Sequence, residues 1–588
     1  MTGAPRPAAL HVDRGVSVEM RDGTITYADV YRPARRGRVP VILQRTPYDR
    51  TRVDPALSQI NPLRAVDRGY AVVVQDCRGR YASEGVFHPF PQEIADGYDS
   101  VEWCASQSWA NGDVGMIGAS YAGAVQWLAA VQAPPSLRCI VPAVTSSDHY
   151  EGWTYRSGAL QWAFIVSWVI PTLAGEAFVN RRFRSKGTER MRRRLVEGTD
   201  DLSALWNTLP LRDLPLVAEL APYVRDWIKH ATNDEYWRQV SIEDRHAQVA
   251  VPALNVGGWY DIFQSGTIRN FVGLRHNGAT DAARNGTRLL MGPWAHSWPT
   301  EQSAGLIDFG VGSSQGWTPL RYDLEAVVFA FLDRWLGGYG ADAVDGPPIR
   351  LFTMGENRWR NETAWPLERT DHQRLYLHSS GNAGSSPSNG RLSVREPRDE
   401  QPDPFTYDPA QPAPTLGGQL CCYPAQLPPG AFDQRLVERW ADVLVYTGEP
   451  LRRDVEVTGF IRANLWAITD APDTDFTAKL VSVEPDGLAL NLTDGLVRAR
   501  YRHGTDAARP IVRGAPVEYT VDLGATSNLF RAGQRIRLEV SSSNFPRFDR
   551  NLNTGHPIGL DAEMRMAHQT VLHDADHASF LELPVIPR

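Results

Sequence analysis

The sequence predicts an α/β protein with a helical insertion and a C-terminal β domain, and three observations lead to this fold class. From about residue 16 to 144, short β-rich runs alternate with helical runs, which is typical of a parallel sheet covered on both faces. Residues 146–240 have almost no strand pattern and are dense in helix formers and tryptophan. Beyond about residue 351, β-rich runs are separated by turn residues.

The alternating region contains the strands and helices expected of a parallel sheet. Its short apolar runs predict strands at 41–44, 71–75, 114–118 and 139–144, with crossover helices at 91–106 and 121–133. The strand pattern resumes after the insertion, at 251–256 and 288–291. Pro252 is compatible with a strand there because it stands at the strand's start. The insertion is therefore expected to interrupt one sheet and to cover the carboxyl ends of its strands.

The C-terminal part is predicted to be a β-sandwich of jelly-roll type. Residues 454–458 and 535–540 alternate strictly between apolar and polar, as half-buried antiparallel strands do. The Gly/Ser/Asn-rich segment 379–390 and the proline-rich segment 397–414 are expected to be surface connections. The expected divisions of the chain are 1–145 and 243–351 for the two parts of the α/β domain, 146–242 for the helical cap and 352–588 for the jelly roll.

Composition and charge narrow the function classes. The 588 residues are 42% hydrophobic and 22% charged, as in globular proteins, and the net charge of −7 argues against a nucleic-acid partner. We interpret the basic run from Arg181 to Arg194 as a solvated helix face. The chain opens without a signal-peptide pattern, and its most apolar segment, 162–173, is short and contains Pro171, so no membrane partner is expected. Five cysteines, an odd number, suit a cytoplasmic location.

A candidate nucleophile stands where a predicted strand meets a predicted helix. The strand ends in Gly118-Ala119-Ser120-Tyr121-Ala122-Gly123, and an alanine-rich helical segment follows. A strand, a tight turn and a helix lift the serine hydroxyl of the turn above a parallel sheet, beside free N–H groups at the helix start. The usual pattern is Gly-x-Ser-x-Gly, and here the second glycine is displaced by one position. Ser120 is the predicted nucleophile, and a serine in an ordinary connection is the alternative.

A serine hydroxyl needs a base and an orienting carboxylate, and candidates for both follow later predicted strands. Asp261 ends the segment Gly-Gly-Trp-Tyr-Asp, and His296 ends the segment Gly-Pro-Trp-Ala-His. The order Ser120, Asp261, His296 is the one found on sheets of this kind. The competing groups, for which capping, surface or solvated positions are expected, are Asp148, Asp234, Glu235, His230, His276, His573 and His577.

Acyl transfer also needs hydrogen-bond donors for an oxyanion. The backbone N–H of Tyr121, directly after the serine, is one candidate. The second is expected from the loop after an early strand, Arg-Thr-Pro-Tyr-Asp at 45–49. Pro47 offers no N–H there, so the phenol of Tyr48 is the candidate donor, with simple packing as the alternative.

A set of segments occurs in a characteristic order along the chain. They are 45–49, 75–85, 118–123, 257–261, 292–296, 473–480 and 541–546. Together they resemble the CocE/NonD hydrolases, in the branch that includes cocaine esterase, and the resemblance covers nearly the whole chain. It implies an α/β-hydrolase domain with an inserted helical cap and a C-terminal jelly roll. It also implies Ser120 as nucleophile, His296 as general base and acid, Asp261 as the orienting residue, and the Tyr48 hydroxyl and Tyr121 N–H as oxyanion donors.

The resemblance leaves the substrate open, because family members hydrolyse esters, amides of amino acids and X-Pro peptides. The candidate substrate-binding residues, for each of which core packing is the alternative, are Trp153, Trp162, Trp168, Trp259, Phe263, Leu420 and Cys421. Around Cys421-Cys422 the family pattern has larger apolar residues, so two cysteines would change the volume and shape of the acyl pocket. The segment after Asp261 contains no carboxylate, which disfavours a cationic amine substrate.

These features predict a serine carboxylesterase for esters with an apolar or aromatic acyl group. An X-Pro dipeptidyl aminopeptidase or an amino-acid ester or β-lactam acylase of the same fold is the first alternative, and a carbohydrate-binding protein acting through the jelly roll is the second. No cofactor is expected, and no metal site either, because neither a second cysteine pair nor a matching histidine spacing accompanies Cys421-Cys422. The expected partner is a small-molecule ester, and a homodimer stays open.

Overall fold

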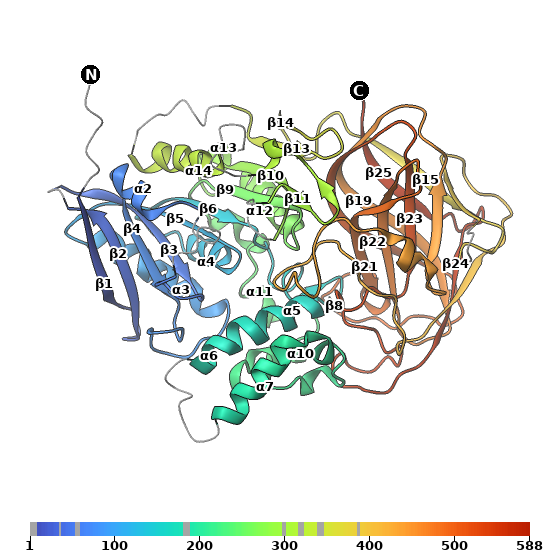
Figure 1. Ribbon diagram of the computed structural model, residues 1–588, viewed down its shortest axis with the longest axis horizontal. Helices are drawn as coiled ribbons and strands as arrows, with labels where there is room; N and C mark the ends of the chain where they lie inside the picture. Colours follow the sequence, from blue (N-terminus) through green and yellow to red (C-terminus); the bar gives the residue numbers. More distant parts are fainter. Residues whose placement is uncertain are drawn as a thin grey trace.

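The computed structural model describes residues 9–34, 37–52, 59–179, 188–296, 301–314, 323–337, 346–384 and 389–588. An α/β part and a β part lie side by side, and a helical segment lies below their junction (Figure 1). The predicted α/β architecture with a separate C-terminal β part is confirmed.

The α/β part is built on a ten-stranded sheet with the order β1-β2-β4-β3-β5-β6-β9-β10-β13-β14. Its strands are β1 Leu10–Glu19, β2 Ile25–Pro33, β3 Val39–Thr46, β4 Ala71–Asp76, β5 Ala110–Ala119, β6 Leu137–Ala143, β9 Leu254–Tyr260, β10 Arg288–Ala295, β13 Ile349–Thr353 and β14 Arg358–Glu362. The strands from β4 to β13 run parallel, while β1, β2 and β14 pair antiparallel at the two edges. All predicted strands of this part are present.

Helices cover both faces of this sheet because its strands are apolar on both faces. The helices of this part are α2 Pro62–Asp67, α3 Pro91–Ser106, α4 Tyr121–Ala130, α12 Gln264–Asn277, α13 Asp281–Gly286, α14 Leu324–Leu332 and the π-helix η6 Asp333–Gly337. On β3, Val41 and Leu43 join a buried cluster with Val125 of α4. The residue between them, Ile42, joins another cluster with Leu332 of α14. Both predicted crossover helices, α3 and α4, are present.

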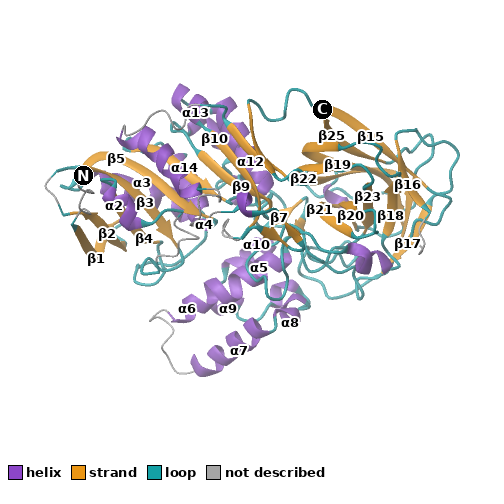
Figure 2. Cartoon of the chain, turned by 45° about the horizontal axis from the view of Figure 1, so that its top comes forward, coloured by secondary structure: helices purple, strands orange, loops and turns teal. Residues whose placement is uncertain are grey.

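The segment between β6 and β9 is mostly helical, as predicted. Its elements are β7 Tyr155–Arg156, β8 Ala159–Leu160, α5 Trp162–Trp168, the π-helix η1 Val169–Ala174, α6 Gly175–Val179, α7 Thr188–Asp200, α8 Leu202–Trp206, η3 Leu211–Asp213, α9 Val217–Leu220, α10 Tyr223–Lys229, α11 Glu235–Arg238 and η4 Glu243–Gln248. Figure 2 shows α6, α7 and α8 projecting below the two sheets. The basic run interpreted as a helix face falls partly on residues 181–187, outside the described residues.

The most apolar helix is longer than the sequence indicated. The apolar segment 162–173 is part of a longer helical run, because α5, η1 and α6 follow one another without a break through Pro171. The wider π-helical turn accommodates a proline, which lacks the N–H of a regular helix. Among the described residues, the run Trp162–Val179 is long and apolar enough to cross a membrane by length and composition, and 61% of it is buried within the protein.

The C-terminal part is an eleven-stranded sheet with the order β17-β24-β19-β25-β15-β16-β18-β23-β20-β21, and β22 also pairs with β19. Its strands are β15 Asp371–His378, β16 Gly390–Ser393, β17 Asp403–Tyr407, β18 Leu444–Gly448, β19 Val455–Thr469, β20 Asp475–Val483, β21 Ala489–Arg498, β22 Val517–Phe530, β23 Arg535–Ser541, β24 Ala567–Leu572 and β25 Phe580–Ile586. These strands surround one buried cluster that includes Val457, Leu480 and Leu538.

The prediction that the whole proline-rich segment 397–414 is a surface connection is wrong. Strand β17 lies inside it and pairs antiparallel with β24 at the edge of the sheet. An edge strand tolerates Pro404, which has no N–H to donate to a second neighbour. Of the other predicted connection, residues 385–388 lie outside the described residues.

The two parts are joined beside the ends of the central parallel strands. The Gln264 side chain of α12 donates to the Ala525 carbonyl of β22 and accepts from the Ala525 N–H. Arg269 of α12 forms an ion pair with Asp522 at 3.3 Å. These contacts hold the β part next to the carboxyl end of β9, where polar side chains gather.

Candidate active site

Ser120 occupies a strained turn between β5 and α4. Its backbone φ is 60° and ψ is −123°, which costs a residue with a side chain about 1–3 kcal/mol. A Cβ on Gly118 would lie 2.6 Å from the Ala122 Cβ, and a Cβ on Gly123 would lie 2.9 Å from the Ala143 carbonyl oxygen. The displaced second glycine is therefore the position where α4 approaches the end of β6, and alanine fits at 122.

Three side chains from three different strand ends form one hydrogen-bonded chain. The His296 Nε2 lies 3.0 Å from the Ser120 Oγ, and the His296 Nδ1 lies 2.7 Å from the Asp261 Oδ1. The Asp261 side chain is fully buried, and the His296 side chain is 12% exposed. The structure thus brings together the three residues that sequence order had selected, in the geometry that a base and its orienting carboxylate need.

The strands that carry Asp261 and His296 are longer than predicted. The sequence indicated strand ends at 256 and 291, with glycine-containing loops leading to each candidate. In the structure β9 continues to Tyr260 and β10 continues to Ala295, so each candidate directly follows its strand. Gly258 is needed inside β9 because a Cβ there would lie 2.2 Å from the Trp294 carbonyl oxygen of β10. These glycines allow close strand contact and do not end the strands.

Tyr48 follows β3 and points its hydroxyl at the same site. The indole N–H of Trp168 donates to the Tyr48 hydroxyl oxygen over 3.0 Å, and this hydroxyl also interacts with the Ser120 side chain. Burial raises the pKa of the Tyr48 phenol, so it stays protonated and able to donate. The Tyr121 N–H begins α4, where helix geometry leaves the first N–H groups without intrahelical partners.

A buried ion pair between Arg45 and Glu93, which the sequence did not reveal, supports the Ser120 turn through Tyr121. The Arg45 guanidinium donates to the Glu93 carboxylate over 2.6 Å and to the Gln75 side chain over 3.1 Å. The Tyr121 hydroxyl donates to the other Glu93 oxygen over 3.1 Å and accepts from the Phe90 N–H. Burial and the nearby Glu93 carboxylate raise the pKa of the Tyr121 phenol well above its usual value. A charged residue within an apolar strand run, as at Arg45, is the signal that could have found this network.

A second buried arginine holds the loop that carries Tyr48. The Arg80 Nε donates to the Pro47 carbonyl over 3.0 Å, and its NH1 donates to the Leu173 carbonyl of η1 over 3.2 Å. The same guanidinium pairs with Glu176 of α6. Arg80 therefore connects the Tyr48 loop to the helical segment, which also supplies Trp168.

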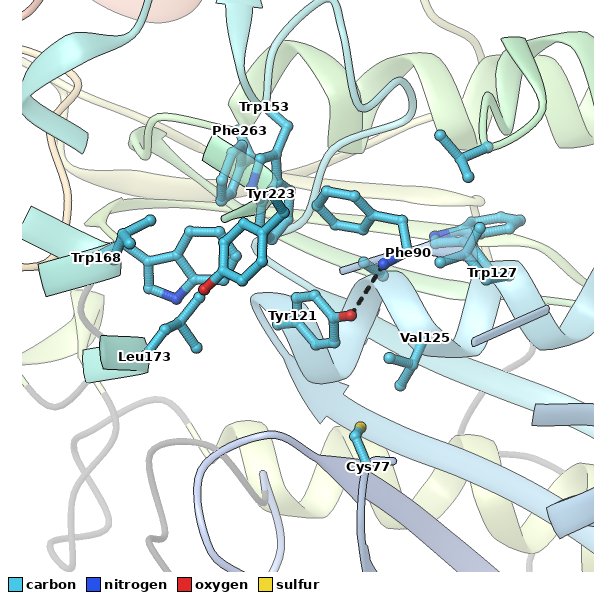
Figure 3. Packing of buried hydrophobic residues seen from close by; sticks show 14 of the residues in the cluster. Cys77, Phe90, Tyr121, Val125, Trp127, Trp153, Trp168, Leu173, Tyr223 and Phe263 are labelled. Carbon is cyan, nitrogen blue, oxygen red and sulfur yellow. Dashed lines mark hydrogen bonds between the residues drawn. The ribbon is translucent and has the colours of Figure 1, made fainter. Parts of the chain in front are cut away.

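Aromatic side chains form a wall beside the hydrogen-bonded chain of Ser120, His296 and Asp261. Figure 3 shows three of these aromatic residues, Trp153, Trp168 and Phe263. Trp153 stacks on Phe263 with ring centroids 4.4 Å apart, and Trp168 meets Trp153 edge to face at 5.4 Å. Phe164 stacks on Trp168, also at 5.4 Å. The Phe263 ring in turn meets the His296 ring edge to face at 5.2 Å. The wall therefore reaches the candidate base.

Of the predicted pocket residues, Trp259 lies in a different buried cluster, and Trp162 shares the cluster of the wall but has its own backbone partner. Trp259 belongs to a different buried cluster, where its indole N–H donates to the Phe352 carbonyl over 2.7 Å and its ring stacks on Trp365. Trp259 is therefore placed apart from Trp153, Trp168 and Phe263, which belong to another buried cluster. Trp162 packs within the helical segment, where its indole N–H donates to the Trp206 carbonyl.

The competing polar residues have structural partners of their own. The Asp148 side chain accepts the N–H groups of Tyr150 and Glu151, and Asp234 caps the N-terminus of α11 and binds His230. His573 lies buried against Asp403, so the expectation that it sits in a solvated tail is wrong. The remaining competitors, Glu235, His276 and His577, lie at exposed or partly buried positions.

Comparison with known proteins identifies the family. A family model for X-Pro dipeptidyl-peptidase (S15 family) matches residues 22–298, and one for the X-Pro dipeptidyl-peptidase C-terminal non-catalytic domain matches residues 342–582. Cocaine esterase from Rhodococcus sp. (strain MB1 Bresler) is 40% identical over 584 residues, which cover 98% of this chain and 99% of that protein. The chain belongs to the CocE/NonD hydrolase family. It is a serine hydrolase acting on carboxylic esters.

Solved structures share the fold of this CocE/NonD chain. An aminopeptidase from the marine sediment archaeon Thaumarchaeota archaeon superposes with a TM-score of 0.79 at 25% identity, covering 100% of this chain and 98% of that one. An α-amino acid ester hydrolase superposes with a TM-score of 0.77 at 24% identity, with the same coverage. The fold is therefore shared by proteins with different substrates, and the substrate has to be argued from the site.

One loop of the β part reaches the site of this CocE/NonD chain. Leu420 and Cys421 are buried, and Cys421 belongs to the same cluster as Trp153, Trp168 and Phe263. Cys421 is joined to the adjacent Cys422 by a disulfide. From the sequence, the two cysteines were expected to be separate side chains in a reducing compartment. In the structure they form one covalent ring beside the aromatic wall.

Proposed function

We propose that this hydrolase cleaves esters with an apolar or aromatic acyl group through an acyl-enzyme intermediate on Ser120. The observation that carries the proposal is the hydrogen-bonded chain from Ser120 through His296 to Asp261, with distances of 3.0 and 2.7 Å. His296 Nε2 takes the hydroxyl proton as the Ser120 oxygen attacks the ester carbonyl. Asp261 holds the ring in the tautomer that presents an unprotonated Nε2.

The tetrahedral intermediate carries its negative charge on the former carbonyl oxygen. The Tyr121 N–H and the Tyr48 hydroxyl are the two donors for this oxyanion. Trp168 donates to the Tyr48 oxygen and so favours the rotamer in which the phenolic hydrogen points toward Ser120. His296 then gives its proton to the leaving alcohol, and a water molecule repeats the sequence on the acyl-enzyme.

The side chains around Ser120 favour an apolar acyl group. Trp153, Trp168, Phe263 and the Cys421–Cys422 ring offer apolar surface and few hydrogen-bond donors. Gln264, the polar residue after Phe263, is bonded through both side-chain atoms to Ala525. A substrate ammonium group would therefore find no carboxylate in this segment, which argues against amino-acid esters and N-terminal dipeptides.

The test is a substrate panel on the purified enzyme. It contains p-nitrophenyl acetate, butyrate and benzoate, an aminoacyl p-nitroanilide and Gly-Pro p-nitroanilide. We expect kcat/KM to be highest for the butyrate or benzoate ester and both anilides to be poor substrates. A preference for Gly-Pro p-nitroanilide would instead assign a dipeptidyl peptidase activity.

A further inference from the structure

The Cys421–Cys422 ring lies close to the proposed general base. One ring nitrogen of His296 and the two cysteine Sγ atoms all lie within 4.8 Å of one another. Cys421 is 9% exposed, Cys422 is partly buried, and the His296 side chain is 12% exposed. Two cysteine sulfurs and an imidazole are a donor set that proteins use for Zn²⁺.

We propose that Cys421, Cys422 and His296 form a redox-gated site for a thiophilic divalent cation such as Zn²⁺, which switches off the esterase when the cysteines are reduced. The proposal rests on the role assigned to His296 under the proposed function. In the disulfide state the sulfurs carry no thiolate, so the pair is only an apolar wall of the acyl pocket. In the dithiol state the same two residues can each offer one thiolate.

Zinc binding takes two steps, reduction of the disulfide and then coordination of the metal. A dithiol reductant such as dithiothreitol gives two electrons and two protons to the S–S bond, which becomes two thiols, while the reductant closes to its own cyclic disulfide. Zn²⁺ then displaces both thiol protons to solvent and accepts the lone pair of the neutral imidazole. Tetrahedral coordination at about 2.3 Å requires the two sulfurs to separate to about 3.8 Å. Rotation of the partly buried Cys422 side chain can provide this separation.

His296 is already oriented for such a role. Its Nδ1 is bonded to the Asp261 carboxylate over 2.7 Å, so the metal ligand would be Nε2, which in this structure lies 3.0 Å from the Ser120 Oγ. A carboxylate, an imidazole and a metal in line is the common arrangement around protein-bound zinc. Zinc on Nε2 would take the lone pair that accepts the Ser120 proton, so binding and ester hydrolysis exclude each other.

The rest of the described chain offers two useful contrasts. The other cysteines, Cys77, Cys104 and Cys139, are buried single thiols whose pKa values burial raises, so they are poor metal ligands in the folded protein. The other group with metal-ligand spacing, His556 with Asp561 and Glu563, contains no cysteine and is partly exposed. Any zinc bound there is independent of the redox state.

The experiment measures zinc stoichiometry and ester hydrolysis on the same full-length protein. Oxidised protein and protein reduced with dithiothreitol, then desalted under argon, are titrated with Zn²⁺ in competition with the indicator 4-(2-pyridylazo)resorcinol. The reduced protein is expected to bind one more Zn²⁺ per chain than the oxidised protein and to lose hydrolysis in proportion, with recovery on adding a chelator. Cys421→Ser/Cys422→Ser is expected to lose this extra zinc, and its hydrolysis, relative to its own zinc-free rate, is expected to become insensitive to Zn²⁺.

Equal zinc binding by oxidised and reduced protein, or extra zinc retained in the double serine variant, would overturn the proposal. If that variant fails to fold, reduced wild-type protein alkylated with iodoacetamide at these two thiols replaces it, with the same expectation. Reduced Ser120→Ala, which is inactive but keeps all three ligands, is expected to bind the extra zinc. A failure of the proposed function would appear separately, as oxidised, zinc-free wild-type protein that hydrolyses no ester.

Discussion

The floor and the wall of the active site are built in different ways. The floor consists of Ser120, Asp261 and His296, each placed directly after a strand of one parallel sheet. The wall combines the helical segment, the residue Phe263 and a loop of the β part that contains Cys421. Sheet register fixes the floor, whereas the wall depends on the packing of segments that are far apart in the chain. Reaction chemistry should therefore respond to changes in the floor, and substrate choice to changes in the wall.

Apart from loss of the nucleophile itself, the largest effect is expected at the edge of the floor. Tyr48→Phe removes one oxyanion donor and keeps the ring, so kcat should fall by about 10²–10³ with little change in stability. Steady-state kinetics with a p-nitrophenyl ester measure this. Tyr31→Phe on β2, which removes a hydroxyl from the same sheet away from the site, is the matched control and should retain full kcat. A loss of less than about tenfold for Tyr48→Phe would make Tyr48 a packing residue.

A change in the wall should alter selectivity more than chemistry. Phe263→Ala removes a buried aromatic ring, worth about 1.5–3 kcal/mol of apolar contact, so kcat/KM for a benzoyl ester relative to an acetyl ester should fall by about 10–100-fold. Trp259→Phe, in the separate buried cluster with Trp365, is the control. It should keep the benzoyl-to-acetyl ratio and lose stability instead, because the buried Phe352 carbonyl loses its donor. A changed ratio in Trp259→Phe would return Trp259 to the acyl pocket.

A third effect concerns the stability of the packing between the wall and the sheet and leaves the chemistry unchanged. His149 packs against Phe90 and Trp153, and its Nδ1 lies 2.7 Å from the Val240 carbonyl. Burial lowers the pKa of His149 from 6.5 to about 4, so the buried ring is neutral. The stability that the neutral ring provides is complete above pH 6.5 and is lost as the pH falls through 4, by about 3 kcal/mol.

Urea unfolding between pH 7 and pH 4 tests this. Wild-type protein should lose more stability over this range than His149→Gln, whose side chain does not titrate. Equal pH dependence of the two proteins would show that other groups, such as acidic ion pairs, control acid stability.

The floor could be predicted from sequence because its signals are local. Gly118 to Gly123 mark the serine turn, and Asp261 and His296 each end a short strand run. The strands β9 and β10 were placed too short, because glycines that serve close strand contact look like loop residues in a sequence. Arg45 and Glu93 were not assigned roles, because their pairing joins a strand to a helix and leaves no local pattern.

The wall was predicted only in part, because its residues come from segments that are far apart in the sequence. Trp153, Trp168 and Phe263 do pack together. Trp259 was expected beside them because it lies two residues before Asp261, but the sequence does not show which buried cluster its side chain joins. The proximity of Cys421 and Cys422 to His296 could not be predicted from sequence, because the cysteines and the histidine are far apart in the chain and form no spacing motif. It exists only because the β part packs against the ends of the parallel strands.

Covalent labelling tests the central claim, that Ser120 is the nucleophile of this ester hydrolase, most directly. Oxidised wild-type protein is treated with a fluorophosphonate, digested, and mapped by mass spectrometry, beside Ser120→Ala. We expect one labelled peptide, modified at Ser120, with loss of ester hydrolysis in proportion to labelling and neither label nor turnover in Ser120→Ala. Labelling at another serine, or turnover retained in Ser120→Ala, would contradict the assignment of the site.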